Sequence, residues 1–277
     1  MPQSSKKSEA LRGIKVVQLS DSHLFSNPEG KLLGINTNDS LQAVIALIKK
    51  EQPDLDLILA TGDLSQDGSE TSYRRFDALI STLKASSYWL QGNHDNAAGM
   101  LQVLAGTERF NPCVIAAGSQ WRIILLNSSV KDEIGGHLEK SSLEFLQKAL
   151  EQLHDKHVLI ALHHPLIDIG SAWLDEQKID NAEQFFNLIK PFKQIKAVLC
   201  GHIHQAMEVY HPECDGLRLL SVPSTCFQFK PKQHDFAADD LAPGYRWLEL
   251  FADGSFSTGV SRISDALFKV DHRLSNY

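Results

Sequence analysis

The sequence predicts an α/β sandwich whose second sheet is partly antiparallel. Short apolar runs alternate with segments of helical period from residue 14 to about residue 200, and hairpin patterns follow Gly201. A chain of 277 residues with 43% hydrophobic content is long enough to bury one large core. We therefore expect one domain over residues 14–262, between a polar N-terminal tail at 1–13 and a C-terminal tail at 263–277.

The first half of the chain predicts two strand and helix units and then a third strand. Residues 14–20 are the first apolar run, and the next helix is marked by apolar residues at helical spacing, Leu41, Val44, Ile45 and Ile48. Residues 56–60 are the second strand, followed by a helix marked by Tyr73, Phe76, Ile80 and Leu83. Residues 88–90 are the third strand, which leads into a turn at Gly92.

The second half continues with strands at 121–126, 158–162 and 197–200. Between the first two we expect a helix that starts at Ser141, because Ser141 and Glu144 have the spacing of a capping box and leucines follow on one face. Another helix is marked by Phe185, Leu188, Ile189 and Phe192. After residue 201 we expect hairpin strands at 208–210, 217–222 and 246–251, with turns at 214–216 and 252–254.

Composition excludes several classes of partner. The formal net charge is -7, from 27 basic and 34 acidic residues, and no long basic run is present, so we expect no nucleic-acid partner. Residues 1–15 lack the apolar core of a secretory signal and no apolar stretch reaches bilayer length, so we expect a cytoplasmic protein without a membrane partner. Four cysteines without a C-x-x-C pair predict reduced structural thiols: Cys113, Cys200, Cys214 and Cys226. The oligomeric state stays open.

Clusters of oxygen and nitrogen donors follow the predicted strands. These segments are Asp21-Ser-His23, Gly62-Asp63, Gly92-Asn93-His94-Asp95, His163-His164-Pro165 and Gly201-His202-Ile-His204. In open α/β sheets, ligands collect past the carboxyl ends of strands, so these side chains can converge on one crevice. Together they can hold two metal ions, and two ions about 3.5–4 Å apart can activate water and clamp a phosphoryl group.

Four of the segments each have a plain structural explanation, whereas Gly92-Asn93-His94-Asp95 is more specific because it places an amide, an imidazole and a carboxylate consecutively after a strand. An Asp after a strand is often a cap, Gly-Asp is a common turn, and the two histidine pairs could be buried or surface pairs with ordinary hydrogen bonds. The joint presence of all five segments in this order is what favours a metal centre.

The ordered signature D-x-H, G-D, G-N-H-[DE], H and G-H-x-H resembles that of the calcineurin-like metallophosphoesterases, and every element of it is present between about Ile14 and His204. The resemblance implies a four-layer α/β sandwich of two mixed β-sheets flanked by helices, with a dinuclear centre at one edge. It places Asp63 between the two metals, with Asp21, His23 and His204 on one ion and Asn93, His163 and His202 on the other. His164 fits a supporting role, although the assignments of His163 and His164 could be reversed. Fe, Mn, Zn or Co are suitable ions, and the resemblance favours an Fe and Mn pair.

The resemblance also implies a mechanism. A metal-bridging hydroxide attacks phosphorus, the two cations and Asn93 bind the non-bridging oxygens, and His94 stabilises or protonates the leaving alkoxide. We expect Asp95 to orient His94. His23 and His204, as ligands beside the phosphate, are also expected to contact the substrate.

Three further segments, residues 170–175, 223–229 and 242–246, are similar to bacterial class III cyclic nucleotide phosphodiesterases. The similarity implies hydrolysis of 3′,5′-cyclic AMP to 5′-AMP. Trp173, Phe227 and Phe229 could offer flat apolar surfaces to the base, or could simply pack the second sheet. The alternatives are a broader phosphodiesterase acting on glycerophosphodiesters or other nucleotides, and a non-catalytic scaffold on the same fold. A scaffold predicts gaps in the ligand set, and the sequence shows none.

Overall fold

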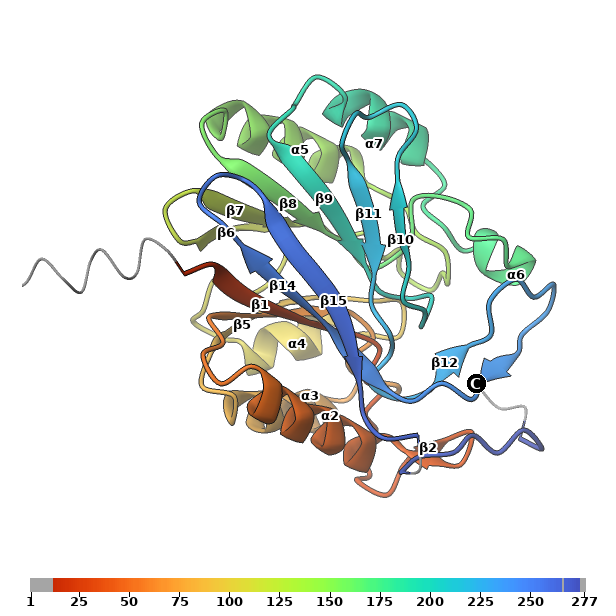
Figure 1. Cartoon of the computed structure of the whole chain (residues 1–277). Coiled ribbons are helices and arrows are strands. Elements are labelled where there is room, and N and C mark those ends of the chain that lie inside the picture. Colours follow the sequence, from red (N-terminus) through yellow and green to blue (C-terminus); the bar gives the residue numbers. More distant parts are fainter. Residues whose placement is uncertain (1–11, 266, 275–277) are drawn as a thin grey trace, which may run out of the picture.

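Two β-sheets lie face to face between two layers of helices in the computed structural model, which describes residues 12–265 and 267–274 (Figure 1). This is the four-layer α/β sandwich that the sequence predicts, and both sheets are mixed. The predicted N-terminal tail at 1–13 lies almost wholly outside the described residues.

The first sheet has the order β15-β14-β1-β4-β5. Its strands are β1 (Ile14–Leu19), β4 (Leu57–Thr61), β5 (Ser86–Leu90), β14 (Gly244–Leu250) and β15 (Phe256–Arg262). Strands β1, β4 and β5 are parallel, and the hairpin β14–β15 joins β1 in the antiparallel sense. The outer face is covered by α2 (Thr37–Glu51), α3 (Glu70–Ser81) and α4 (Ala97–Val103).

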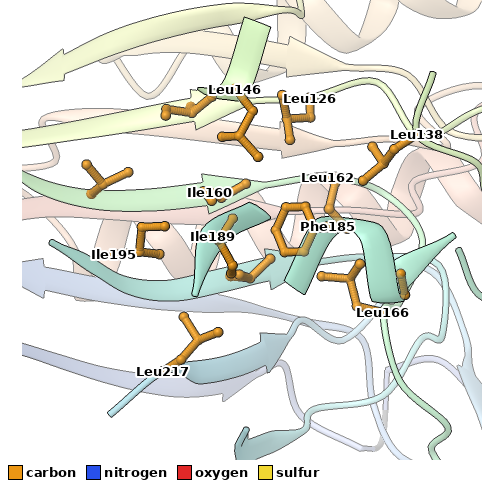
Figure 2. Packing of buried hydrophobic residues seen from close by; sticks show 14 of the residues in the cluster. Leu126, Leu138, Leu146, Ile160, Leu162, Leu166, Phe185, Ile189, Ile195 and Leu217 are labelled. Atoms are coloured by element: carbon orange, nitrogen blue, oxygen red, sulfur yellow. The ribbon is translucent and has the colours of Figure 1, made fainter. Parts of the chain in front are cut away.

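The second sheet has the order β10-β11-β9-β8-β7-β6. Its strands are β6 (Cys113–Ala117), β7 (Trp121–Leu125), β8 (His157–Ala161), β9 (Ile195–Cys200), β10 (Glu208–Tyr210) and β11 (Arg218–Ser221). Helices α5 (Lys140–Gln152) and α7 (Ala182–Ile189) cover its outer face. Figure 2 shows part of the apolar layer beneath them, where Phe185 and Ile189 of α7 lie beside Ile160 and Leu162.

The core explains why the apolar runs of the sequence are continuous rather than alternating. The central strands are buried on both faces, because one face meets helices and the other meets the opposite sheet. Val16 and Leu59 of the first sheet and Ile123 and Leu159 of the second share the layer between the sheets. Each such side chain contributes about 1.5–3 kcal/mol by its burial.

Hydrogen bonds connect the ends of β1, β4 and β9, and one of them, from Gln18 to Cys200, joins the two sheets. The buried Gln18 Nε2 donates to Thr61 Oγ1 at 3.0 Å and to the Cys200 carbonyl at 3.1 Å. Ser20 Oγ donates to the Thr61 carbonyl at 3.0 Å. These bonds fix the strand ends, and the donor segments of the sequence begin one or two residues beyond them.

Smaller elements build an apolar cluster beside the strand ends. They are β2 (Lys31–Leu32), β3 (Ile35–Asn36), α6 (Ala172–Asp175), β12 (Gln228–Phe229) and β13 (Ala238–Asp239). Phe268 and Val270 of the C-terminal segment pack against this cluster, and the Asp271 N–H donates to the Leu33 carbonyl at 2.8 Å. The described part of the C-terminal tail is therefore anchored to the fold, a role that its charged sequence does not reveal.

The structure corrects one predicted helix start and adds two elements that the sequence analysis did not predict. The predicted capping box is wrong, because α5 begins at Lys140 and its N-cap Glu139 makes no side-chain cap bond, which leaves Ser141 inside the first turn. Strand β6 and helix α4 have no counterpart among the predicted elements.

The prediction of free thiols is confirmed for all four cysteines. In the described part of the chain, no helix combines the length and the apolar character needed to cross a membrane.

Candidate metal centre

The donor segments meet at one edge of the sandwich, past the ends of β1, β4, β5, β8 and β9. Their backbones turn sharply there. Of the nine non-glycine residues with positive φ in the described chain, five are donors, namely Asp21 (56°), His23 (46°), Asp63 (50°), His202 (64°) and His204 (47°). Such residues cost about 1–3 kcal/mol each when strained, and they persist where the surrounding structure holds them for function.

Asp21, His23 and His204 form the first donor cluster. His204 Nε2 lies 3.5 Å from Asp21 Oδ1, and His23 Nε2 lies 3.2 Å from His204 Nε2. The Nδ1 of His204 contacts the Phe227 carbonyl at 2.9 Å, and the Nδ1 of His23 contacts Gln66 Oε1 at 2.7 Å. Since both oxygens accept, both Nδ1 atoms donate and the two Nε2 lone pairs face one another. A cation between them removes the repulsion, so this cluster fits a metal.

Asn93, His163 and His202 form the second cluster. Asn93 Oδ1 lies 3.2 Å from His163 Nε2 and 3.1 Å from His202 Nδ1. His163 Nδ1 donates to the Thr61 carbonyl at 2.8 Å, which turns the Nε2 lone pair of the neutral ring inward. Burial lowers the pKa of His163, but Asp63, with smaller contributions from Asp21 and the Thr61 carbonyl, outweighs burial and raises this pKa to about 9. In the metal-free chain a proton on His163 therefore offsets the Asp63 charge.

Asp63 lies between the two clusters. Its Oδ2 is 3.2 Å from His163 Nε2, while its Oδ1 accepts from the His94 N–H at 2.9 Å. A carboxylate oxygen of Asp63 lies within 4.8 Å of a ring nitrogen of His23 and within 4.8 Å of a ring nitrogen of His163, as a bridging carboxylate requires. Burial alone would raise the pKa of Asp63, but the neighbouring histidines, His163 before His94 and His23, together outweigh burial and hold this pKa well below its ordinary value.

Two buried carboxylate oxygens, Asp21 Oδ2 and Asp63 Oδ2, accept no hydrogen bond of good geometry from the described residues, although Asp63 Oδ2 has the ion-pair contact with His163. A buried charged oxygen without a partner is costly, and native proteins normally pair it or bind a metal with it. These orphaned oxygens, together with the facing imidazole lone pairs, show that the donor set fits a pair of cations.

Glycines allow the donors to approach this closely. A Cβ at Gly92 would collide with the Asp63 carboxylate, and a Cβ at Gly62, where φ is +95°, would collide with the His163 ring. Side chains at either position would displace a donor of the centre.

The geometry separates His163 from His164. Ligand atoms of His163, His164 and His202 lie within 4.8 Å of one another, so distance alone does not choose between the first two. However, His164 Nδ1 bonds to Ser128 Oγ at 2.9 Å and its Nε2 donates to the Ile134 carbonyl at 3.0 Å. Both ring nitrogens of His164 are thus engaged in holding the 128–134 loop, which favours His163 as the ligand.

His94 lies where the donor clusters open into a cleft of about 1140 Å³. Its ring packs edge to face against His23, with centroids 5.0 Å apart. Asn93 and His202 of the second cluster line the cleft together with His94, so a ligand there can reach the second cluster. The segment 129–134 also lines this cleft.

The expected role of Asp95 is wrong, because its carboxylate points to the backbone rather than to the His94 ring. It accepts from the N–H groups of Leu64, Ser65 and Gly92 and from the Tyr73 hydroxyl, at 2.9–3.2 Å. Burial, with a further contribution from Asp63, raises the pKa of Asp95 to about 7. Asp95 therefore ties the loop that carries Asp63 to the turn that carries Asn93.

Of the three aromatic residues expected near a base, only Trp173 lines the cleft. Phe227 and Phe229 are fully buried, and Phe229 stacks on the His204 ring with centroids 4.1 Å apart and an angle of 11°. They offer no open face to a ligand, so the structure corrects their expected role to support of His204. Trp173 packs edge to face on Phe229 at 4.8 Å.

Sequence reasoning missed two glutamines of the site. Gln66 contacts His23 as described, and Gln177 Oε1 accepts from His202 Nε2 at 2.8 Å. Gln66 stands three residues after Asp63, so its place could have been suspected, whereas Gln177 follows α6 and carries no sequence signal.

Comparison with known proteins accounts for this arrangement. Residues 14–206 match the family described as calcineurin-like phosphoesterase, a range that contains every donor of both clusters. The chain belongs to the calcineurin-like phosphoesterase family.

Curated family members resemble the chain over almost its whole length. The 3′,5′-cyclic adenosine monophosphate phosphodiesterase CpdA of Pseudomonas aeruginosa is 42% identical over 95% of each chain. The protein of the same name from Vibrio vulnificus is 39% identical over 100% of each chain. Among solved structures, a dimetal phosphatase from Danio rerio superposes with a TM-score of 0.65 at 12% identity, covering 91% of this chain and 100% of its own. That likeness shows the fold alone.

Proposed function

We propose that this phosphoesterase hydrolyses 3′,5′-cyclic AMP to 5′-AMP at a centre of two metal ions. The relatives that carry this activity in their names match the chain end to end, and the donor set of the chain is complete. The complete set also argues against a non-catalytic scaffold on the same fold.

Asp21, His23 and His204 would hold one ion and Asn93, His163 and His202 the other, with Asp63 shared. Carboxylate, amide and imidazole donors suit Fe, Mn, Zn or Co, and we propose an Fe and Mn pair. When bound, such a pair supplies Lewis acidity toward the phosphate and a nucleophile derived from water at neutral pH.

His94 protonates the leaving 3′ oxygen. Its ring stands at the boundary between the donor clusters and the cleft, and its backbone is fixed by the N–H bond to Asp63. An alkoxide is a strongly basic leaving group, so a positioned acid contributes roughly 10²–10⁴-fold in rate. Asn93 lies beside it and helps to position the phosphate oxygens.

Trp173 forms the wall of the cleft nearest the base. Phe236 packs on it with ring centroids 5.5 Å apart, and both line the cleft. Ile134, 60% exposed, presents a further apolar surface in the same cleft. Apolar walls around a few convergent polar groups are typical of small-molecule sites. We propose that the purine packs between these walls while its phosphate reaches the metals.

The test is hydrolysis by the metal-reconstituted chain of 3′,5′-cyclic AMP, 3′,5′-cyclic GMP, a glycerophosphodiester and bis-p-nitrophenyl phosphate. We expect cyclic AMP to have the highest kcat/KM of the natural diesters and to yield 5′-AMP. A preference for the glycerophosphodiester, or formation of 3′-AMP, would contradict the proposal.

A broader phosphodiesterase is the second candidate. Burial of Phe227 and Phe229 leaves Trp173 as the only one of the three expected rings at the cleft, which weakens selection for a base. Comparable kcat/KM values for all four substrates would favour this candidate.

A further inference from the structure

We propose that Gln66 and Gln177 are positioning residues of the metal centre, one for each ion. Each amide oxygen fixes the tautomer of a ligand histidine, and each amide nitrogen donates a hydrogen bond to the anionic phosphodiester in the cleft. The inference rests on the two-metal centre of the proposed function.

Gln66 determines which nitrogen of His23 is available to a metal. With Gln66 Oε1 2.7 Å from Nδ1, the ring donates from Nδ1 and keeps the lone pair on Nε2, the atom that faces His204. The reversed amide would donate to Nδ1, and the proton would then lie on Nε2 and block the metal. The Gln66 backbone is itself fixed, because its N–H donates to the Leu24 carbonyl at 2.9 Å.

Gln177 performs the same task for His202 on the opposite nitrogen. Here Nδ1 faces Asn93 Oδ1 at 3.1 Å, and Nε2 donates to Gln177 Oε1 at 2.8 Å. The backbone of Gln177 is held at both ends, since its N–H donates to the Leu174 carbonyl and its carbonyl accepts from the Gly136 N–H. In each donor cluster, one glutamine oxygen thus accepts a hydrogen bond from one ligand histidine and leaves the other ring nitrogen unprotonated.

An amide suits this position better than the carboxylate that often supports ligand histidines. The centre already contains Asp21 and Asp63, and its substrate is an anion, so a further negative charge at the cleft would oppose binding. Gln66 and Gln177 both line the cleft, and no described residue accepts a hydrogen bond from either side-chain nitrogen. Since the oxygen of each amide is committed to a histidine, the nitrogen is the atom left for a substrate.

Leucine and glutamate substitutions separate the two roles. Gln66→Leu and Gln177→Leu remove the acceptor at similar volume, and we expect metal affinity to fall by about 10–100-fold in competition with a chromophoric chelator, without substrate. Gln66→Glu and Gln177→Glu keep the acceptor, so metal affinity stays within threefold of the parent while KM for the diester rises at least tenfold. Gln91→Leu is the matched control, because Gln91 lines the same cleft and, among the described residues, its hydrogen bonds go to Asn111 and Ser129 rather than to a ligand histidine.

Parent-like metal affinity in both leucine variants would overturn the tautomer role, and an unchanged KM in both glutamate variants would overturn the substrate role. Gln66→Asn and Gln177→Asn, which stay polar but are too short to reach the ring, must weaken metal binding as the leucine variants do. A cooperative thermal unfolding transition of each variant, measured after metal removal with a chelator, verifies that the variant is folded. Because affinity is measured without substrate, failure of the cyclic AMP assignment leaves this result intact.

Discussion

Each ligand histidine of the proposed centre is oriented through its second ring nitrogen. Main-chain carbonyls hold two of them and glutamine amides hold the other two, in the pairs His163 with Thr61, His204 with Phe227, His23 with Gln66 and His202 with Gln177. The rings therefore point inward before any metal arrives, which lowers the ordering cost of binding.

Removal of the His94 side chain tests its role as acid. We expect His94→Ala to retain both metals and to lose roughly 10²–10⁴-fold in kcat on cyclic AMP, because the 3′ oxygen leaves as a basic alkoxide. Turnover of bis-p-nitrophenyl phosphate should fall far less, since its leaving group needs no proton. Steady-state kinetics on both substrates with metal analysis provides the measurement, and equal losses on the two would count against the role.

Buried neutral histidines make the metal-free chain sensitive to acid. Burial lowers the pKa of His23 and of His164 to about 3, and it lowers the pKa of His202 well below its ordinary value. Between about pH 3 and pH 6.5 the unfolded chain thus binds more protons at these residues than the folded chain does, and stability rises with pH. The low pKa values of Asp21 and Asp63 act only below about pH 4.

We therefore expect the free energy of unfolding of the metal-free protein to fall as pH drops from 6.5 to 4.5, by up to about 1.4 kcal/mol per pH unit for each of the three histidines. Asp95, whose pKa is raised to about 7, opposes this by the equivalent of one histidine, because the folded chain keeps its proton in this range. Urea unfolding at several pH values measures this slope. His164→Gln should flatten it, because one buried histidine that must charge on unfolding is gone. A stability independent of pH over this range would refute the explanation.

At the scale of elements, the strands were predictable because buried apolar runs and donor segments alternate along the chain. Strand β6 was missed although its five residues are all apolar, and its side chains alternate in burial because it lies at the edge of the second sheet. The donors could be found from their order, but the direction of Asp95 toward backbone amides and the burial of Phe227 and Phe229 depend on tertiary packing that no local pattern encodes. Gln177 reaches the site only because α6 and the 128–138 loop meet, through bonds such as Gly136 N–H to its carbonyl.

The C-terminal segment contributes to the apolar cluster beside the strand ends, which includes Phe229, the residue that stacks on His204. Phe268 packs against that cluster, whereas its neighbour Leu267 is 61% exposed. We expect Phe268→Ala to lower the free energy of unfolding by about 1–3 kcal/mol, less than for a fully buried Phe, and Leu267→Ala to change it by less than about 0.5 kcal/mol. Chemical denaturation of the two variants measures the difference, and equal effects would show that the segment is not packed as described.

At the scale of the whole molecule, the centre is assembled from both halves of the sandwich. Asp21, Asp63 and Asn93 follow strands of the first sheet, while His163 and His202 follow strands of the second. The buried Arg246 of β14 adds to the joint made by Gln18, because its Nε donates to the Ser221 carbonyl of β11 at 2.8 Å. Neither sheet alone holds a complete donor cluster, so the chemistry depends on how the sheets are packed.

The proposed activity requires two cations per chain. Calorimetric titration of the metal-free protein with Mn²⁺, followed in parallel by cyclic AMP hydrolysis, tests this directly. We expect two ions to bind per chain, activity to require the second, and Asp63→Asn to weaken both sites because this carboxylate is shared. Full activity with one ion per chain, or in the chelated protein, would contradict it.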